Sequence, residues 1–64
     1  MATKLIGRQV EVVGQGWIGV IEQQRRTRCY GTVYTVRCVR SENWAVTPGD
    51  IGRGWHLWQL RTVA

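Results

Sequence analysis

The stretch VEVVGQGWIGVI, residues 10–21, decides the fold of this 64-residue chain. Two runs of β-branched and aromatic residues flank Gly14-Gln15-Gly16, and glycines adopt the positive φ angles that tight hairpins require. The segments 9–13 and 17–23 are therefore predicted to be the two strands of a β-hairpin.

Side chains alternate between the two faces of a strand, which predicts the residues that share a face in each strand of the hairpin. In the first strand, Val10 and Val12 share a face. In the second, Trp17, Gly19 and Ile21 share one. A glycine inside a strand usually marks a bulge or a close backbone approach, and we expect one of these at Gly19.

The remainder of the chain also favours short strands. The charged segment Gln23–Arg28 predicts either a connecting loop or a strand tip that projects into water. Strand-like runs follow at Thr32–Arg40 and Trp44–Val46. The segment Thr47–Gly54 holds the only proline and three glycines, which predicts an irregular loop. The segment Trp55–Val63 fits either a last strand or one helical turn before a short strand.

These segments predict an all-β fold, a small five-stranded barrel that occupies residues 1–64 as one domain. Tyr34, Val36 and Cys38 are expected to face the core from the third strand. Residues 1–8 are a lead-in in which Leu5 and Ile6 cover one end of the core. A chain this short buries a small core, so self-association is an expected way to gain stability.

The charge of the chain favours a polyanionic partner. Nine Lys or Arg against four Asp or Glu give a formal charge of +5, and eight of the nine cations are arginine. Arginine binds phosphate with a planar fork and also stacks on bases, so nucleic acid, RNA or DNA, is the expected partner. The candidate contacts are Arg25, Arg26, Arg28, Arg37, Arg40 and Arg53. The alternative is that these arginines only solvate the surface.

Four tryptophans are too many for a core of this size to enclose fully. We expect Trp17 and Trp44 in or near the core. Trp55 and Trp58 are expected to reach the surface, where they and Tyr30 are candidate aromatic contacts for bases. The same exposed rings also suit a protein interface, because Trp and Arg dominate interface hot spots.

No catalytic or metal signature is present in the sequence. His56, Cys29 and Cys38 have no recognised metal-ligand spacing. Nothing in the sequence groups Asp50, the only aspartate, with His56 and Ser41 as a catalytic triad. We therefore predict no metal, no cofactor and no catalytic residue. The two cysteines are expected to be structural thiols, because we also predict a cytoplasmic protein.

The cytoplasmic prediction rests on hydropathy. Residues 1–7 lack the apolar centre of a signal peptide, and no apolar run approaches the length of a membrane span, so no membrane partner is expected.

The first hairpin resembles the KOW motif of ribosomal proteins and transcription elongation factors, which belongs to the Src homology 3-like small barrels. The resemblance rests on the segment Gly7–Val12, on Gly14 at the turn and on Gly19 followed by Val20 and Ile21. It implies a Src homology 3-like barrel and contact with nucleic acid.

A second resemblance is to the plasmid-borne type B dihydrofolate reductases, short chains of the same barrel group that assemble into tetramers. Gly7, Val10, the segment Trp17–Ile21 and the segment Tyr34–Val36 are similar in order and approximate spacing. The Val-Gln-Ile-Tyr substrate motif of that family has no counterpart here, because the corresponding region reads Trp55–Leu60. The resemblance therefore implies an oligomer but not the reductase activity.

Three functions follow in order of preference. The first is a small, basic, non-enzymatic module that binds nucleic acid through the arginine-rich segment and exposed aromatic rings. The second is a protein-interaction or accessory module, of the kind that phages and plasmids encode, which binds a host protein or itself. The third is an oligomer of the type B reductase kind.

Overall fold

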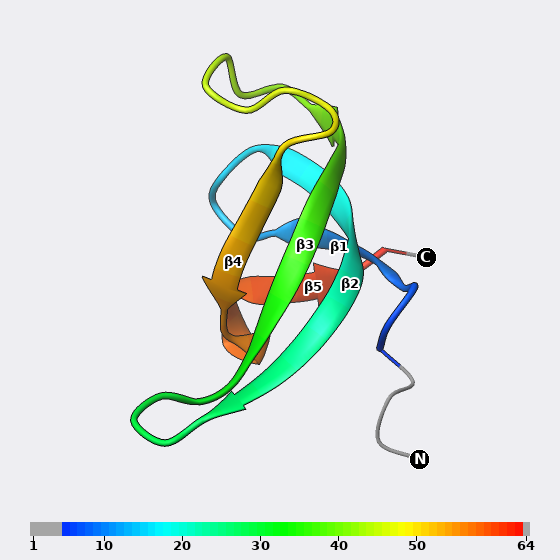
Figure 1. The fold of residues 1–64 in the computed structure, drawn as a ribbon. Helices are drawn as coiled ribbons and strands as arrows, with labels where there is room; N and C mark the ends of the chain where they lie inside the picture. Colours follow the sequence, from blue (N-terminus) through cyan, green and yellow to red (C-terminus); the bar gives the residue numbers. More distant parts are fainter. Residues whose placement is uncertain (1–4, 64) are drawn as a thin grey trace.

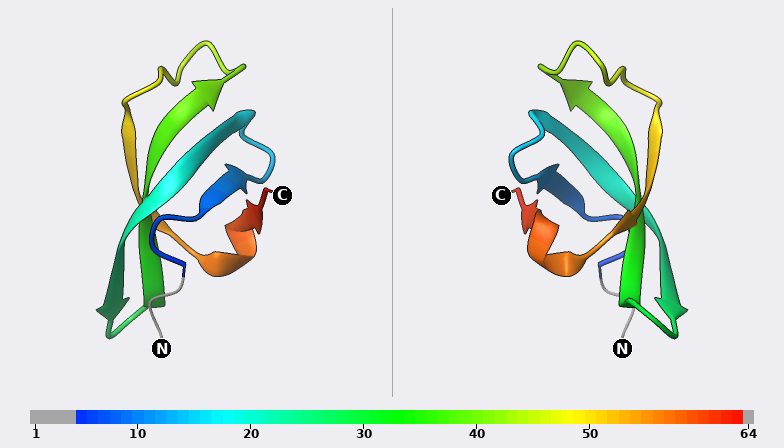
Figure 2. Two further views of the ribbon diagram at one scale, coloured as in Figure 1. Left: turned by 90° about the vertical axis from the view of Figure 1, so that its right-hand side faces the viewer. Right: turned by 90° about the vertical axis from the view of Figure 1, so that its left-hand side faces the viewer.

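The computed structural model describes residues 5–63, which form one antiparallel sheet of five strands and one 3-10 turn. The elements are β1 (Gln9–Val12), β2 (Trp17–Thr27), β3 (Gly31–Ser41), β4 (Ile51–Trp55), η1 (Leu57–Gln59) and β5 (Leu60–Thr62). The strand order is β4-β3-β2-β1-β5, so η1 connects the two edge strands (Figure 1). The sheet is strongly twisted, as the side views show (Figure 2). The all-β prediction is confirmed.

The first hairpin forms where the sequence predicts it. Gly14 and Gly16 adopt φ angles of 78° and 77°, which are strained for other residues, and the turn between β1 and β2 uses both. The strands pair in a register that sets Val10 opposite Gly19 and Val12 opposite Trp17. The predicted sharing of faces is confirmed, and the face of Val10, Val12, Trp17 and Ile21 is the buried one.

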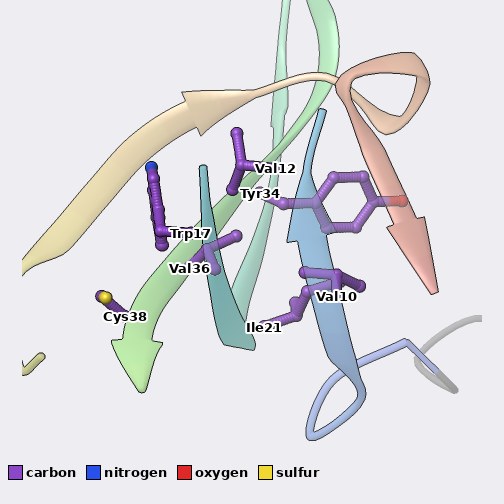
Figure 3. Close-up of a cluster of buried hydrophobic side chains, with 7 residues drawn as sticks. All are labelled: Val10, Val12, Trp17, Ile21, Tyr34, Val36 and Cys38. Atoms are coloured by element: carbon purple, nitrogen blue, oxygen red, sulfur yellow. The ribbon is translucent and has the colours of Figure 1, made fainter. Parts of the chain in front are cut away.

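The core is a single small cluster on one face of the sheet. Its buried members are Val10, Val12, Trp17, Ile21, Tyr34, Val36 and Cys38, and Figure 3 shows their side chains converging between the strands. The inward orientation predicted for Tyr34, Val36 and Cys38 is confirmed. The predicted irregularity at Gly19 is also confirmed, because the β2–β3 register shifts between Ile18 and Gly19.

The strand predicted at Trp44–Val46 is wrong, because this segment forms a turn. The side-chain Oδ1 of Asn43 accepts a hydrogen bond from the backbone N–H of Ala45 (2.9 Å), and the Asn43 carbonyl accepts one from Val46 (3.0 Å). Asparagine competes in this way with strand pairing. The prediction that Trp44 lies in or near the core is also wrong, since the turn leaves it 96% exposed.

The irregular loop predicted at Thr47–Gly54 is wrong in its second half, where β4 begins at Ile51. A turn over residues 47–50 is tied to β3, because the Cys38 N–H donates to the Asp50 carbonyl and the Gly49 N–H to the Cys38 carbonyl, both at 2.8 Å. These bonds align the following residues with the free edge of β3. Glycine is tolerated in such an edge strand, and Pro48 stays outside it.

Of the two alternatives for the C-terminal segment, the helical turn before a short strand is the one that forms. The side chain of Gln59 caps the turn by accepting a hydrogen bond from the His56 N–H (2.9 Å). At the other terminus Leu5 packs against the core, whereas Ile6 is exposed. Residues 1–4 of the predicted lead-in lie outside the described residues. Between residues 5 and 63 no helix has the length and hydropathy to cross a membrane.

Candidate functional site

The strands β2 and β3 extend beyond the rest of the sheet as a two-stranded ribbon. The strand β1 pairs with β2 only as far as Val20, and β4 pairs with β3 only as far as Tyr34. The ribbon of residues 23–33, here called the projecting ribbon, therefore has free edges and points away from the sheet, at the lower left of Figure 1. Of the two alternatives for Gln23–Arg28, the strand tip in water is correct up to Thr27.

The tip of the projecting ribbon is a short, ordered turn. The hydroxyl of Thr27 donates to the Gly31 carbonyl (2.9 Å) and accepts from the Tyr30 N–H (3.0 Å). Gly31 completes the turn with a φ of 76°, the positive angle that closes three-residue hairpin loops. This geometry holds Arg28 and Tyr30 outward, and Tyr30 is 72% exposed.

One face of the projecting ribbon forms the side of an open groove of about 510 Å³. The groove is lined by Gln23, Arg25, Thr27, Val33, Thr35, Arg53 and Gly54. Two guanidinium groups from different strands, Arg25 on β2 and Arg53 on β4, thus share one groove whose lining contains no carboxylate. The groove can hold an anion, with amide and hydroxyl groups as further donors.

The opposite face of the ribbon has an arginine of its own. Gln24 pairs with Tyr34 and Arg26 with Thr32, and Tyr34 points into the core. Because side chains alternate along a strand, Arg26 lies on the core side of the sheet, beyond the end of the core, whereas Arg25 lies on the outer side. The ribbon therefore has one arginine on each face and a third, Arg28, at its tip.

The other candidate arginines lie beside carboxylates. The Nε of Arg37 is 2.7 Å from Glu22 Oε2, and the same arginine donates from an Nη atom to Oε1 at 3.1 Å. Arg40 lines a smaller pocket of about 230 Å³ together with Glu11 and Glu42. Arg37 is thus ion-paired, whereas Arg40 has two acidic neighbours in its pocket but no carboxylate within 4.0 Å.

The arginines of the projecting ribbon and its groove have no such partner. Within residues 5–63, neither Arg25, Arg26, Arg28 nor Arg53 has a carboxylate oxygen within 4.0 Å. Arg8 and Arg40 on the body of the sheet also have no carboxylate within that distance, so four of the six unpaired arginines in residues 5–63 lie on the ribbon and its groove.

The predicted aromatic contacts are dispersed. Tyr30 lies at the ribbon tip, and Trp58 on η1 is 78% exposed, with its ring stacked on His56 at a centroid distance of 6.1 Å. Trp55 was expected at the surface but is half-buried against the core, where it packs edge to face on Trp17. Its position opposite Tyr34 places it at the base of the ribbon.

The cysteines lie in different surroundings. Cys29 is exposed at the ribbon tip, Cys38 is buried in the core, and both are free thiols. Burial raises the pKa of Cys38, and the charge of Asp50 adds to this effect, while a backbone hydrogen bond at Arg40 opposes it. Across the described part of the chain, no three His, Cys, Asp or Glu residues gather in a way that could hold a metal ion.

Five groove residues were not among the site residues predicted from the sequence: Gln23, Thr27, Val33, Thr35 and Gly54. The sequence pattern that could have indicated Gln23 and Thr27 is their period-two alternation with Arg25. This alternation places the three side chains on one face only if the segment is a strand. Comparison of the chain with protein-family models, curated proteins and solved structures finds no match.

Proposed function

We propose that this protein is a non-enzymatic module that binds nucleic acid through the projecting ribbon. The observation behind the proposal is that four of the six arginines without an ion-pair partner in residues 5–63 lie around the ribbon and its groove, whereas both ion-paired arginines, Arg37 and Arg61, lie on the body of the sheet. An exposed cluster of unpaired guanidinium groups on a thin projection suits a ligand with regularly spaced phosphates.

The ribbon supplies two kinds of contact. Arg25, Arg26, Arg28 and Arg53 each neutralise one phosphate, which releases condensed counterions from the nucleic acid. Tyr30, beside Arg28 at the tip, offers an exposed ring for contact with a base. Four phosphate contacts predict that log Kd rises with log salt concentration with a slope of about 3.6.

The test is the fluorescence anisotropy of a labelled oligonucleotide titrated with protein at several salt concentrations. The double variant Arg25→Gln/Arg26→Gln should weaken binding and lower the salt slope by about 1.8. The matched control is Arg40→Gln/Arg61→Gln, which removes the same charge from residues beside carboxylates and should leave the slope near its original value. Equal effects of both variants, or no binding at low salt, would refute the proposal.

A second candidate, a protein-docking module, is favoured by one observation. Trp44 is 96% exposed on the β3–β4 connection, which lies at the opposite end of the molecule from the ribbon tip (Figure 2). A tryptophan this exposed is a typical interface anchor. Docking at this end predicts that a protein partner stays bound at high salt. It also predicts that Trp44→Ser abolishes this binding and that Arg25→Gln/Arg26→Gln does not.

A further inference from the structure

We infer that the nucleic acid is duplex DNA and that the projecting ribbon enters its major groove tip first. This inference rests on the proposed function and specifies its ligand. Two observations support it: the ribbon has free edges over residues 23–33, and its arginines lie on both faces and at the tip.

The dimensions of the ribbon fit one groove. A single layer of strands with its side chains is about 10 Å thick, judged from the spacing of stacked sheets. The major groove of B-DNA is about 12 Å wide and admits a two-stranded ribbon, whereas the minor groove is about 6 Å wide. The major groove of duplex RNA is deep and too narrow for side chains to read.

The positions of the arginines fit the depth of that groove. Arg26 precedes Arg28 by two residues and Arg25 precedes it by three, which at about 3.3 Å per residue places them roughly 7–10 Å behind Arg28. The groove is about 8.5 Å deep. With the tip at the floor, Arg25 and Arg26 lie at the rim, where each face of the ribbon meets the phosphates of one DNA strand.

In this binding mode Arg28 at the tip contacts base edges instead of a phosphate, so the expected salt slope on duplex DNA is about 2.7, not 3.6. Arg28 is exposed on an ordered turn, and arginine pairs with the O6 and N7 acceptors of guanine, which the major groove presents. A single strand offers phosphates to one face of the ribbon at a time, so it uses either Arg25 or Arg26 but not both. Binding to duplex DNA should therefore weaken in both the Arg25 and the Arg26 variant, whereas binding to a single strand should weaken in only one of them.

The experiment compares four ligands of one sequence, about 20 base pairs or nearly two helical turns in length. These are duplex DNA, duplex RNA, single-stranded DNA, and duplex DNA whose cytosines are replaced by glucosylated hydroxymethylcytosine. The glucose is uncharged and fills the major groove. Unmodified duplex DNA should bind more tightly than the other three by about tenfold or more, the scale on which groove contacts discriminate.

Two single variants complete the test. Arg25→Gln and Arg26→Gln should each lower the salt slope on duplex DNA by about 0.9. Equal binding to the glucosylated duplex, preference for single strands or RNA, or an effect of only one of the two variants would overturn the inference while leaving nucleic-acid binding intact. Absence of binding to all four ligands would overturn the proposed function as well.

Discussion

Gly19 on β2 lies against the carbonyl of Arg37 on β3, so closely that no Cβ atom fits between the two backbones. A Cβ built on Gly19 would overlap the Arg37 carbonyl oxygen and lie 2.6 Å from Val36 Cγ1. The β2–β3 register shifts at this point, and the two longest strands coil around it. A second register shift follows between Ile21 and Gln23, where the ribbon begins.

Replacement of Gly19 by alanine should destabilise the fold by about 1–3 kcal/mol, because the obstructing atoms are backbone and a buried valine. Urea unfolding followed by tryptophan fluorescence measures the loss. The control is Gln24→Ala, an exposed position of the same strand, which should change stability by less than about 0.5 kcal/mol. A Gly19→Ala protein as stable as the wild type would contradict the close approach.

Asn43 ties the β3–β4 connection to the first hairpin. Its Nδ2 donates to the Gln15 carbonyl (2.8 Å), and its Oδ1 accepts from the Ala45 N–H. Asn43→Ala removes both bonds and should cost about 1–3 kcal/mol, whereas Asn43→Asp keeps the acceptor and should cost about half as much. The unfolding midpoints of the three proteins measure these losses. Equal losses in the two variants would show that the Ala45 bond, which Asn43→Asp keeps, contributes little.

The four tryptophans should differ widely in their effect on stability. Trp17 is 5% exposed in the core and Trp44 is 96% exposed. Trp17→Ala should cost about 3–5 kcal/mol, which is enough to unfold a domain of this size, whereas Trp44→Ala should cost less than about 0.5 kcal/mol. Far-ultraviolet circular dichroism during heating measures both. A large loss in Trp44→Ala would show that the exposed turn packs against something in solution, such as a second copy of the chain.

Cys38 should make the fold sensitive to alkaline pH. Burial raises the pKa of its thiol, so the folded state favours the neutral form. This stabilisation is complete below the ordinary thiol pKa of about 8.5 and is lost as the pH rises through the higher pKa of the folded state. Urea unfolding at neutral and alkaline pH should show a decline that is smaller in Cys38→Val.

The two thiols should also differ in reactivity. A thiol reagent should modify exposed Cys29 in the native protein and Cys38 only on unfolding, because the thiolate is the reactive form. Rapid labelling of both residues under native conditions would contradict the burial of Cys38.

Glu22 should limit the binding of nucleic acid, because it pairs with Arg37 next to the ribbon. The pair is partly exposed, so Glu22→Gln should change stability by less than about 1 kcal/mol. Without the Glu22 carboxylate, Arg37 has no ion-pair partner and can bind a further phosphate. The salt slope should therefore rise by about 0.9. Glu11→Gln is the matched control, because it releases Arg61 on β5 at the other edge of the sheet. A slope that rises equally in both variants would indicate a general charge effect.

The sequence by itself determined the first hairpin, the residues that share a face in β1 and β2, the inward face of β3, and the choice of Arg25, Arg26 and Arg28 as a cluster. Period-two alternation and glycine turns are local signals, and they are strongest where a strand has one buried face.

The tertiary structure decided the rest. Whether residues 23–27 form a loop or a strand depends on backbone pairing with β3, and β4 forms because β3 has a free edge beside a tethered turn. The Arg37–Glu22 ion pair and the groove shared by Arg25 and Arg53 each join residues distant in sequence. The exposure of Trp44 depends on the turn in which it lies. Such contacts follow from the pairing and twist of the strands, which no local pattern of residues specifies.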